Sequence, residues 1–346
     1  MLYPLKFKPR FVEKIWGGRK LNTVLNKTLP SDKPIGESWE LYDFPPGVVD
    51  SSKDWVSAEV ANGPLAGRTL HSLVAEFGAA LCADVKLVGA HGSTALTAGG
   101  QFPILIKFLD AREDLSVQVH PPQEYADKHP GAHLKTEAWY VMQHEPGARI
   151  LKGLMPGVTK ARFEAQIKDG TVESAIKSIP VKVGDCHFLP SGTVHALGAG
   201  ILCAEVQTPS DTTFRVFDFN RLENGKPRKL HIQESLECID FSGKPEPQQK
   251  RSHSASYFTT VTRLVTCPFF NIEKVRFTEG VEETVPYDQP VVWMMLEGEA
   301  QVKVDDVKEP TTLKKGETVL LPARMKNPVI KTMSDCQWLE VTFPTA

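Results

Sequence analysis

The segment Gly184-Asp185-Cys186-His187-Phe188-Leu189-Pro190-Ser191-Gly192-Thr193-Val194-His195 sets the expectation for the fold of this chain. A Gly-Asp pair turns the chain into a short strand, and Pro-x-Gly turns it again directly after that strand. Gly and Pro are the residues that tight turns require, because Gly adopts backbone angles that other residues avoid and Pro fixes its own. The pattern therefore predicts a hairpin that ends on His195.

Two upstream segments add side chains that can bind a metal. Residues 115–121 alternate apolar and polar side chains, so Gln118 and His120 lie on one face of the predicted strand. Glu137 stands at the start of a second strand-like run. Together with His195 they offer two imidazoles, one carboxylate and one amide oxygen, which suits zinc and similar divalent ions. We therefore predict a metal site formed by Gln118, His120, Glu137 and His195.

The rest of the chain favours short strands with a few helices. The 346 residues include 26 Pro and 25 Gly, and at roughly 150 residues per domain they suggest about two domains. Residues 102–109 form a near-continuous apolar run, as in a buried strand. Helical spacing of apolar residues appears over 69–85, and short helices are expected at 160–168 and 172–177. A Gly-, Ala- and Thr-rich loop is expected near residues 91–100.

A polar, proline-rich linker at residues 242–250 divides the chain. We expect a metal-binding domain over 1–241, with N-terminal strands and short helical insertions. A β domain without metal is expected over 251–346, with strands at 257–265, 271–277, 291–296, 300–304, 317–321 and 337–343. The second domain repeats the turn pattern at Gly316-Glu317, with Pro322 after the strand. It lacks the following Gly, and no His occurs after His253.

Composition narrows the functional classes. The 40 basic and 42 acidic residues give a net charge of −2, which argues against broad nucleic-acid binding. No apolar run is long enough to span a membrane, and the first residues do not resemble a signal peptide. The six cysteines are scattered and form no C-x-x-C pair, as is typical of free thiols in a reducing compartment. We expect a soluble cytoplasmic protein, monomeric unless its assembly shows otherwise.

Two family resemblances follow from these motifs. The Gly184–His195 segment resembles the second motif of the cupin superfamily, which implies a mainly β protein with two jelly-roll, cupin-like barrels. The chain also resembles type I phosphomannose isomerase in its short bacterial form. That resemblance is carried by Lys14-Ile15-Trp16-Gly17-Gly18, Gly36-Glu37-Ser38-Trp39-Glu40, Ser116-Val117-Gln118-Val119-His120-Pro121, Lys135-Thr136-Glu137-Ala138-Trp139-Tyr140-Val141, Ala204-Glu205-Val206-Gln207 and Ser210-Asp211-Thr212-Thr213-Phe214-Arg215.

The resemblance implies an isomerase that interconverts mannose 6-phosphate and fructose 6-phosphate with one zinc ion per chain. Its zinc ligands fall on the four residues named above, and its catalytic arginine falls on Arg215. Its acidic groups fall on Glu205 and Asp211, and its active-site lysine on Lys135. Trp16 and Ser116 match positions that line the substrate pocket.

Several points stay open at the level of sequence. Glu205, Asp211 and Lys135 can each carry a proton. On a regular strand Lys135 would point away from Glu137, whereas a turn would free it to meet a phosphate. No nucleotide-binding glycine pattern occurs, so the phosphate contacts are unassigned. The alternative functions are a metal-dependent cupin dioxygenase and a non-enzymatic cupin that binds sugars. A four-ligand site and the Arg215 motif argue against both.

Overall fold

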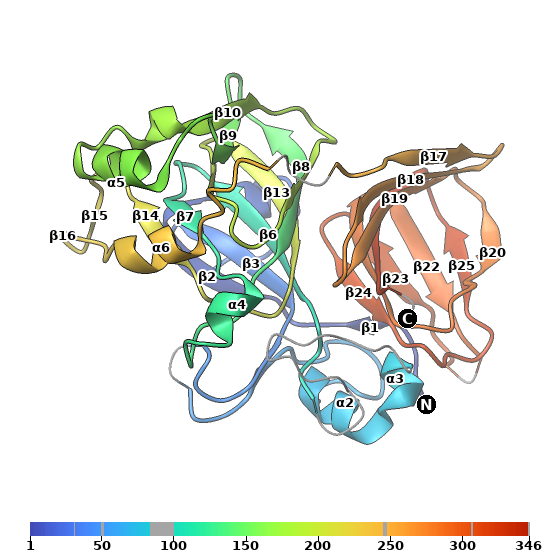
Figure 1. Ribbon diagram of the computed structural model, residues 1–346. Helices are drawn as coiled ribbons and strands as arrows, with labels where there is room; N and C mark the ends of the chain where they lie inside the picture. The colour runs from blue at the N-terminus through green and yellow to red at the C-terminus, as the bar shows by residue number, and fades with distance from the viewer. Residues whose placement is uncertain (31, 50–51, 84–99, 245–247, 306, 345–346) are drawn as a thin grey trace.

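The computed structural model describes residues 1–30, 32–49, 52–83, 100–244, 248–305 and 307–344. The protein is mainly β, and two halves lie side by side (Figure 1). The expected loop at 91–100 and the expected helix end at residues 84–85 lie largely outside the described residues. Within them, no helix is long and apolar enough to cross a bilayer.

The first half consists chiefly of two sheets packed face to face. The six-stranded sheet has the order β11 (Cys186–Leu189), β8 (Glu137–His144), β13 (Ile201–Gln207), β6 (Leu105–Ala111), β2 (Arg10–Gly18) and β3 (Ile35–Leu41). The five-stranded sheet has the order β10 (Ile176–Pro180), β9 (Arg149–Leu154), β12 (His195–Leu197), β7 (Val117–Val119) and β14 (Phe214–Phe217). Between the sheets, Trp139, Leu109, Ile150 and Leu197 form part of a buried apolar cluster.

The second half repeats this arrangement. Its seven-stranded sheet has the order β1 (Leu5–Lys6), β24 (Thr318–Leu321), β21 (Val291–Glu297), β26 (Cys336–Thr342), β19 (Asn271–Phe277), β18 (Thr259–Thr266) and β17 (Ser252–Ala255). Its four-stranded sheet has the order β20 (Glu282–Thr284), β25 (Val329–Thr332), β22 (Glu299–Lys303) and β23 (Thr311–Lys314). Strand β1 comes from the start of the chain, so the N-terminus is tied to the C-terminal sheet.

Helices and short hairpins complete the fold. The helices are α1 (Lys20–Thr23), α2 (Leu70–Phe77), α3 (Ala79–Cys82), α4 (Gln123–Ala126), α5 (Lys160–Lys168), α6 (Ile232–Cys238) and a 3₁₀ turn (Val172–Ala175). The hairpins are β4 (Asp43–Phe44) with β5 (Val56–Ser57), and β15 (Leu222–Glu223) with β16 (Lys226–Pro227). Helices α5 and α6 pack on the outer face of the five-stranded sheet, where they cover Val117, Val119 and Val216.

Two expected helices differ from the structure. The single helix expected from residue 69 is broken at Gly78, whose φ of +47° with ψ of −120° is a conformation that favours glycine. Thr69 caps the first piece by accepting a hydrogen bond from the Ser72 amide at 3.2 Å. The segment 172–177 forms only one 3₁₀ turn and then enters β10, whereas the helix at 160–168 is confirmed.

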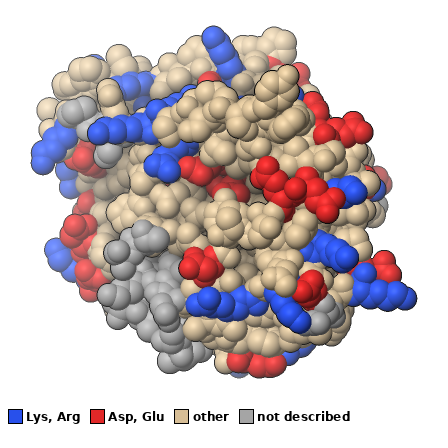
Figure 2. All heavy atoms as spheres, turned by 90° about the vertical axis from the view of Figure 1, so that its right-hand side faces the viewer, with Lys and Arg blue, Asp and Glu red and all other residues tan. Residues whose placement is uncertain are grey.

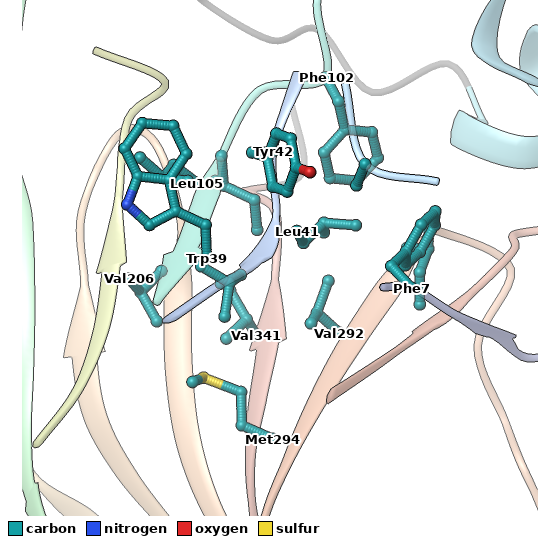
Figure 3. Packing of buried hydrophobic residues seen from close by; sticks show 14 of the residues in the cluster. Phe7, Trp39, Leu41, Tyr42, Phe102, Leu105, Val206, Val292, Met294 and Val341 are labelled. Carbon is teal, nitrogen blue, oxygen red and sulfur yellow. The ribbon is translucent and has the colours of Figure 1, made fainter. Parts of the chain in front are cut away.

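The two halves share a continuous apolar core. Figure 3 shows this packing, in which side chains of the first half meet strands β21 and β26 of the second. The labelled residues are Phe7, Trp39, Leu41, Tyr42, Phe102, Leu105 and Val206 from the first half, and Val292, Met294 and Val341 from the second. The outer faces of the six- and seven-stranded sheets are thereby buried against each other. Because burial of apolar surface is the main stabilising term in folding, the halves support one another.

The face of the second half carries charges of both signs. Figure 2 shows acidic and basic side chains interspersed over a largely uncharged surface. This distribution agrees with the near balance of 40 basic and 42 acidic residues in the sequence.

Candidate metal centre and active site

Three side chains converge between the two sheets of the first half. His120 directly follows β7, Glu137 begins β8 and His195 begins β12. Their ligand-type atoms all lie within 4.8 Å of one another, and each residue is about 1% exposed. Both sheets of the first half thus contribute to the cluster, since β7 and β12 belong to the five-stranded sheet and β8 to the six-stranded sheet.

The turn after β11 brings His195 to the cluster, but the predicted hairpin does not form. The chain crosses here from one sheet to the other, so that β11 pairs with β8 whereas β12 pairs with β7 and β9. Gly192 has a φ of +82°, and a Cβ at this position would lie 3.0 Å from the Cys238 carbonyl oxygen. The Gly192 amide donates a hydrogen bond to the His120 carbonyl at 2.9 Å, which ties the turn to the strand that carries the other histidine. Glycine is therefore favoured at this position both by backbone angle and by space.

Gln118 lies beside this cluster. Its Cα is the register partner of His195 across β7 and β12, and its Nε2 is 3.3 Å from His195 Nε2. Because oxygen and nitrogen of an amide are assigned from their surroundings, a rotated side chain would present the oxygen instead. The structure thus brings all four predicted ligand residues together.

Backbone contacts fix the orientation of both imidazoles. His120 Nδ1 lies 3.0 Å from the Thr212 carbonyl oxygen, and His195 Nδ1 lies 2.8 Å from that of Thr193. A carbonyl only accepts, so Nδ1 carries the proton and each Nε2 presents a lone pair in the neutral ring. Burial, with the charge of Lys135 next, lowers the pKa of His120 to about 3, which keeps this ring neutral near pH 7.

The two Nε2 lone pairs point at a carboxylate. His120 Nε2 is 3.3 Å from Glu137 Oε2, and His195 Nε2 is 3.2 Å from Glu137 Oε1. Both Glu137 oxygens and His120 Nε2 are buried without a hydrogen-bond partner among the described residues. Burial alone would raise the pKa of Glu137, but Lys135 and His120 hold it well below its usual value. Buried acceptors that face one another without a proton fit a cation bound between them.

Lys135 reaches the cluster because it precedes the regular strand. Its amide donates to the Pro121 carbonyl at 3.3 Å, outside the ladder of β8. The buried Nζ lies 3.1 Å from Glu137 Oε2. The expectation for a regular strand, that Lys135 would point away from Glu137, therefore does not apply.

Glu205 belongs to a buried charged row on the six-stranded sheet. Register places Trp39, Lys107, Glu205 and Trp139 side by side across β3, β6, β13 and β8. Trp139 Nε1 donates to Glu205 Oε2 at 2.9 Å, and Lys107 Nζ lies 3.6 Å from Oε1. Burial, followed by the charge of Glu137, raises the pKa of Glu205, while Lys107 opposes that rise.

Sequence reasoning missed Lys107 and Glu37. Lys107 Nζ lies 3.3 Å from Glu37 Oε2, and Lys14 Nζ lies 2.9 Å from Glu37 Oε1. These cations offset burial, so that the pKa of Glu37 is lowered. The signal was present in the sequence, because Lys107 is the one charged residue in the apolar run 102–109. A buried lysine requires a charged partner, and that requirement points to a polar interior.

The remaining candidates lie around this interior. Arg215 is the register partner of Gln118, its Nη1 donates to the Lys229 carbonyl at 2.8 Å, and its Nε is buried without a partner among the described residues. Asp211 is exposed, although its charge contributes to raising the pKa of Lys107. Trp16 and Ser116 are both buried, at the end of β2 and just before β7.

Comparison with known proteins identifies relatives over nearly the whole chain. Residues 4–151 match the family model for the catalytic domain of type I phosphomannose isomerase. The chain is 36% identical to a mannose-6-phosphate isomerase of Streptococcus mutans, covering 94% of this chain and 95% of the relative. It is 34% identical to mannose-6-phosphate isomerase ManA of Bacillus subtilis, covering 96% and 97%.

Solved structures give the same result. The crystal structure of a mannose 6-phosphate isomerase from Bacillus subtilis superposes with a TM-score of 0.83 at 30% identity, covering 99% of this chain and all of the other. A phosphomannose isomerase from Salmonella typhimurium superposes with a TM-score of 0.72 at 15% identity, which shows a shared fold.

Proposed function

This chain belongs to the type I phosphomannose isomerase family, and from that premise we propose that it interconverts mannose 6-phosphate and fructose 6-phosphate with one bound zinc ion. The observation that carries the proposal is the meeting of two imidazole nitrogens and one carboxylate in a buried site, where both carboxylate oxygens accept no hydrogen bond from the described residues. A sugar phosphate is then the small-molecule partner of this site, and we expect the monomer to be the active unit.

Gln118, His120, Glu137 and His195 are the residues that would hold the ion. Two imidazoles, a carboxylate and an amide oxygen are suitable zinc donors. Bound there, zinc would act as a Lewis acid that favours negative charge on the sugar oxygens. The hydrogen bonds from Nδ1 of His120 and His195 to backbone carbonyls would keep both rings in the ligating orientation.

The reaction moves one proton between two neighbouring carbons. In the open-chain aldose a proton leaves C2 and is returned at C1, while a hydroxyl proton passes from O2 to O1, so that an enediol lies between the two sugars. Glu205 is the proton carrier that burial favours, because its Oε1 accepts no hydrogen bond within the described part of the chain and burial raises its pKa. Asp211 is exposed, and Lys135 is already in an ion pair with Glu137. We therefore propose that these two residues orient neighbouring charged groups and do not carry the proton.

Arg215, Trp16 and Ser116 complete the proposed site. Arg215 lies in the same cross-strand row as Gln118 and His195. Its Nε, which has no hydrogen-bond partner among the residues that the structure describes, would be a permanently charged donor for the enediolate. Trp16 and Ser116 would line the pocket as the family resemblance implies.

A coupled assay tests this function. We expect purified protein with zinc restored to form fructose 6-phosphate from mannose 6-phosphate. Absence of turnover with zinc present would reject the proposal. Oxygen uptake with bound iron would instead support the dioxygenase, and sugar binding without turnover would support the binding protein.

We also propose that residues 1–241 form the catalytic unit and residues 251–346 a β unit without metal. The halves share a Trp–Glu pair, since Trp293 Nε1 donates to Glu340 Oε2 at 2.8 Å as Trp139 does to Glu205. In the first half Glu137 pairs with Leu189 across β8 and β11. In the second half Val291 pairs with Leu321 across β21 and β24, so Val291 holds the position equivalent to Glu137. The second half thus places an apolar side chain at the position of the carboxylate ligand.

This difference predicts the metal content. Elemental analysis of the full-length, tag-free protein is expected to give about one zinc per chain, because imidazole and carboxylate donors converge in the first half. The variant His195→Ala should then lose nearly all zinc. A stoichiometry near two in the wild type that falls to about one in the variant would place a second metal outside this site and overturn the prediction.

A further inference from the structure

Two arginines donate hydrogen bonds to a single buried carboxylate beside the proposed active site. Asp218 follows β14 and is 5% exposed. Arg228 donates through Nε and Nη2 to its two oxygens at 2.7 and 2.5 Å, and Arg221 donates through Nη2 at 2.7 Å. Burial would raise the pKa of Asp218, but these hydrogen bonds lower it. Asp218 is therefore an anion that orients two guanidinium groups.

Strand register places this cluster next to the metal-binding residues. Strand β14 runs antiparallel to β7, with Arg215 opposite Gln118 and Phe217 opposite Val117. Asp218 is thus level with the chain just before Val117, where the buried Ser116 lies. Arg221 Nη1 also donates to the Asp114 carbonyl, at the start of that segment. The arginines therefore lie about two to four residues along the strand from Gln118, or roughly 7–13 Å.

The charge of the cluster matches a phosphate. Arg215, Arg221 and Arg228 with Asp218 give a net charge of about +2, and Arg228 lies near enough to Arg215 to lower its pKa, after burial. A phosphate monoester carries about −1.5 to −2 near pH 7. Glu223 also acts on Arg215, from the exposed hairpin β15–β16 at the edge of the first half (Figure 1).

The other buried cations are already neutralised. Lys135 contacts Glu137, and Lys107 lies between Glu37 and Glu205. The arginine cluster, in contrast, retains N–H groups that can donate to a ligand. A guanidinium has five N–H groups, and Arg228 donates to Asp218 only through Nε and Nη2. Arg215 Nε is likewise unpartnered among the described residues.

We propose that Arg221 and Arg228, held by Asp218, bind the phosphate group of the sugar substrate, with Arg215 adding its charge between phosphate and metal. This inference rests on the proposed isomerase function and assigns the phosphate end of the same site. It separates the site into a metal end, where carbons 1 and 2 react, and an arginine end, which recognises the ester. Planar guanidinium groups suit that task, because they bind phosphate with two parallel hydrogen bonds.

The test measures how Arg228→Met, Arg221→Met and Arg228→Lys change KM and kcat separately. Each Met variant should raise KM for mannose 6-phosphate about 10- to 100-fold, the effect of one lost hydrogen bond to a charged group, with kcat within about two-fold. Arg228→Lys should give an intermediate KM. Arg263→Met, which removes an ion pair with Glu273 in the second half, is the matched control and should behave as wild type.

Thermal unfolding with inorganic phosphate gives a readout independent of turnover. Phosphate should raise the melting temperature of wild type and of Arg263→Met, and it should raise that of the Arg228 and Arg221 Met variants much less. Folded Met variants with unchanged KM and full phosphate stabilisation would overturn the proposal, as would a fall in kcat alone. If wild type turned over no mannose 6-phosphate, the proposed function would fail. The change in melting temperature with inorganic phosphate would still test whether Arg221 and Arg228 bind an anion.

Discussion

His195→Ala is expected to lose its zinc and its activity together. The variant removes one of the two neutral nitrogens that face Glu137, and the remaining groups leave a coordination position open. Several kcal/mol of Lewis-acid stabilisation would be lost, so we expect kcat to fall by at least about 10³-fold. Zinc content by elemental analysis and the coupled assay measure the two effects on the same sample.

Two further variants separate ligation from folding. Glu137→Gln keeps the shape of the side chain while it removes the charge, and it should lose zinc as well. His253→Ala removes an exposed histidine in β17 of the second half and should keep both zinc and activity. Full zinc occupancy in folded His195→Ala would exclude His195 as a ligand.

Arg215→Ala is expected to retain zinc and fold while it loses turnover. Arg215 stands opposite Gln118, and its buried Nε has no hydrogen-bond partner in the described part of the chain, so we expect it to donate to the reacting oxygens. Loss of a donor to a developing oxyanion typically lowers kcat by about 10²–10³-fold, and we expect a fall of that size. Steady-state kinetics with zinc analysis and a thermal melt make the measurement.

The kinetic pattern distinguishes two roles for Arg215. A raised KM with unchanged kcat would make it a phosphate ligand like Arg228 rather than a group that acts on the enediolate. Arg215→Lys keeps the charge without the planar fork, so partial recovery of kcat would indicate that charge is the main contribution. A variant that lost zinc would instead show that Arg215 supports the metal site.

The turn chemistry of the sequence predicted the local turn but not which strands pair around it. Pro190 and Gly192 predicted the turn before His195, and alternation along residues 115–121 predicted a strand, whereas the predicted hairpin is wrong because β11 and β12 belong to different sheets. These signals succeed because they depend on the backbone angles of a few neighbouring residues. The helix expected over 69–85 failed at Gly78, where a local conformation outweighed the apolar spacing around it.

Contacts between distant strands could not be predicted from such local sequence signals. Nothing near Lys107 in the sequence indicates that Glu37 and Glu205 flank it, because they come from strands about 70 and 98 residues away along the chain. The pairing of β1 with β24, from opposite ends of the chain, was equally hidden. Such contacts depend on how the sheets pack, and side-chain patterning within one strand does not specify its neighbours.

The sequence by itself therefore determined the mainly β class, the candidate metal-ligand residues and the family resemblance, since each depends on residue chemistry at short spacing. Only the tertiary structure decided which lone pairs meet at Glu137, that Lys135 reaches it, and that Arg221 and Arg228 share Asp218. The physical reason is the same in each case. Buried charges and lone pairs are stable only beside specific partners, and those partners are brought together by the packing of distant strands.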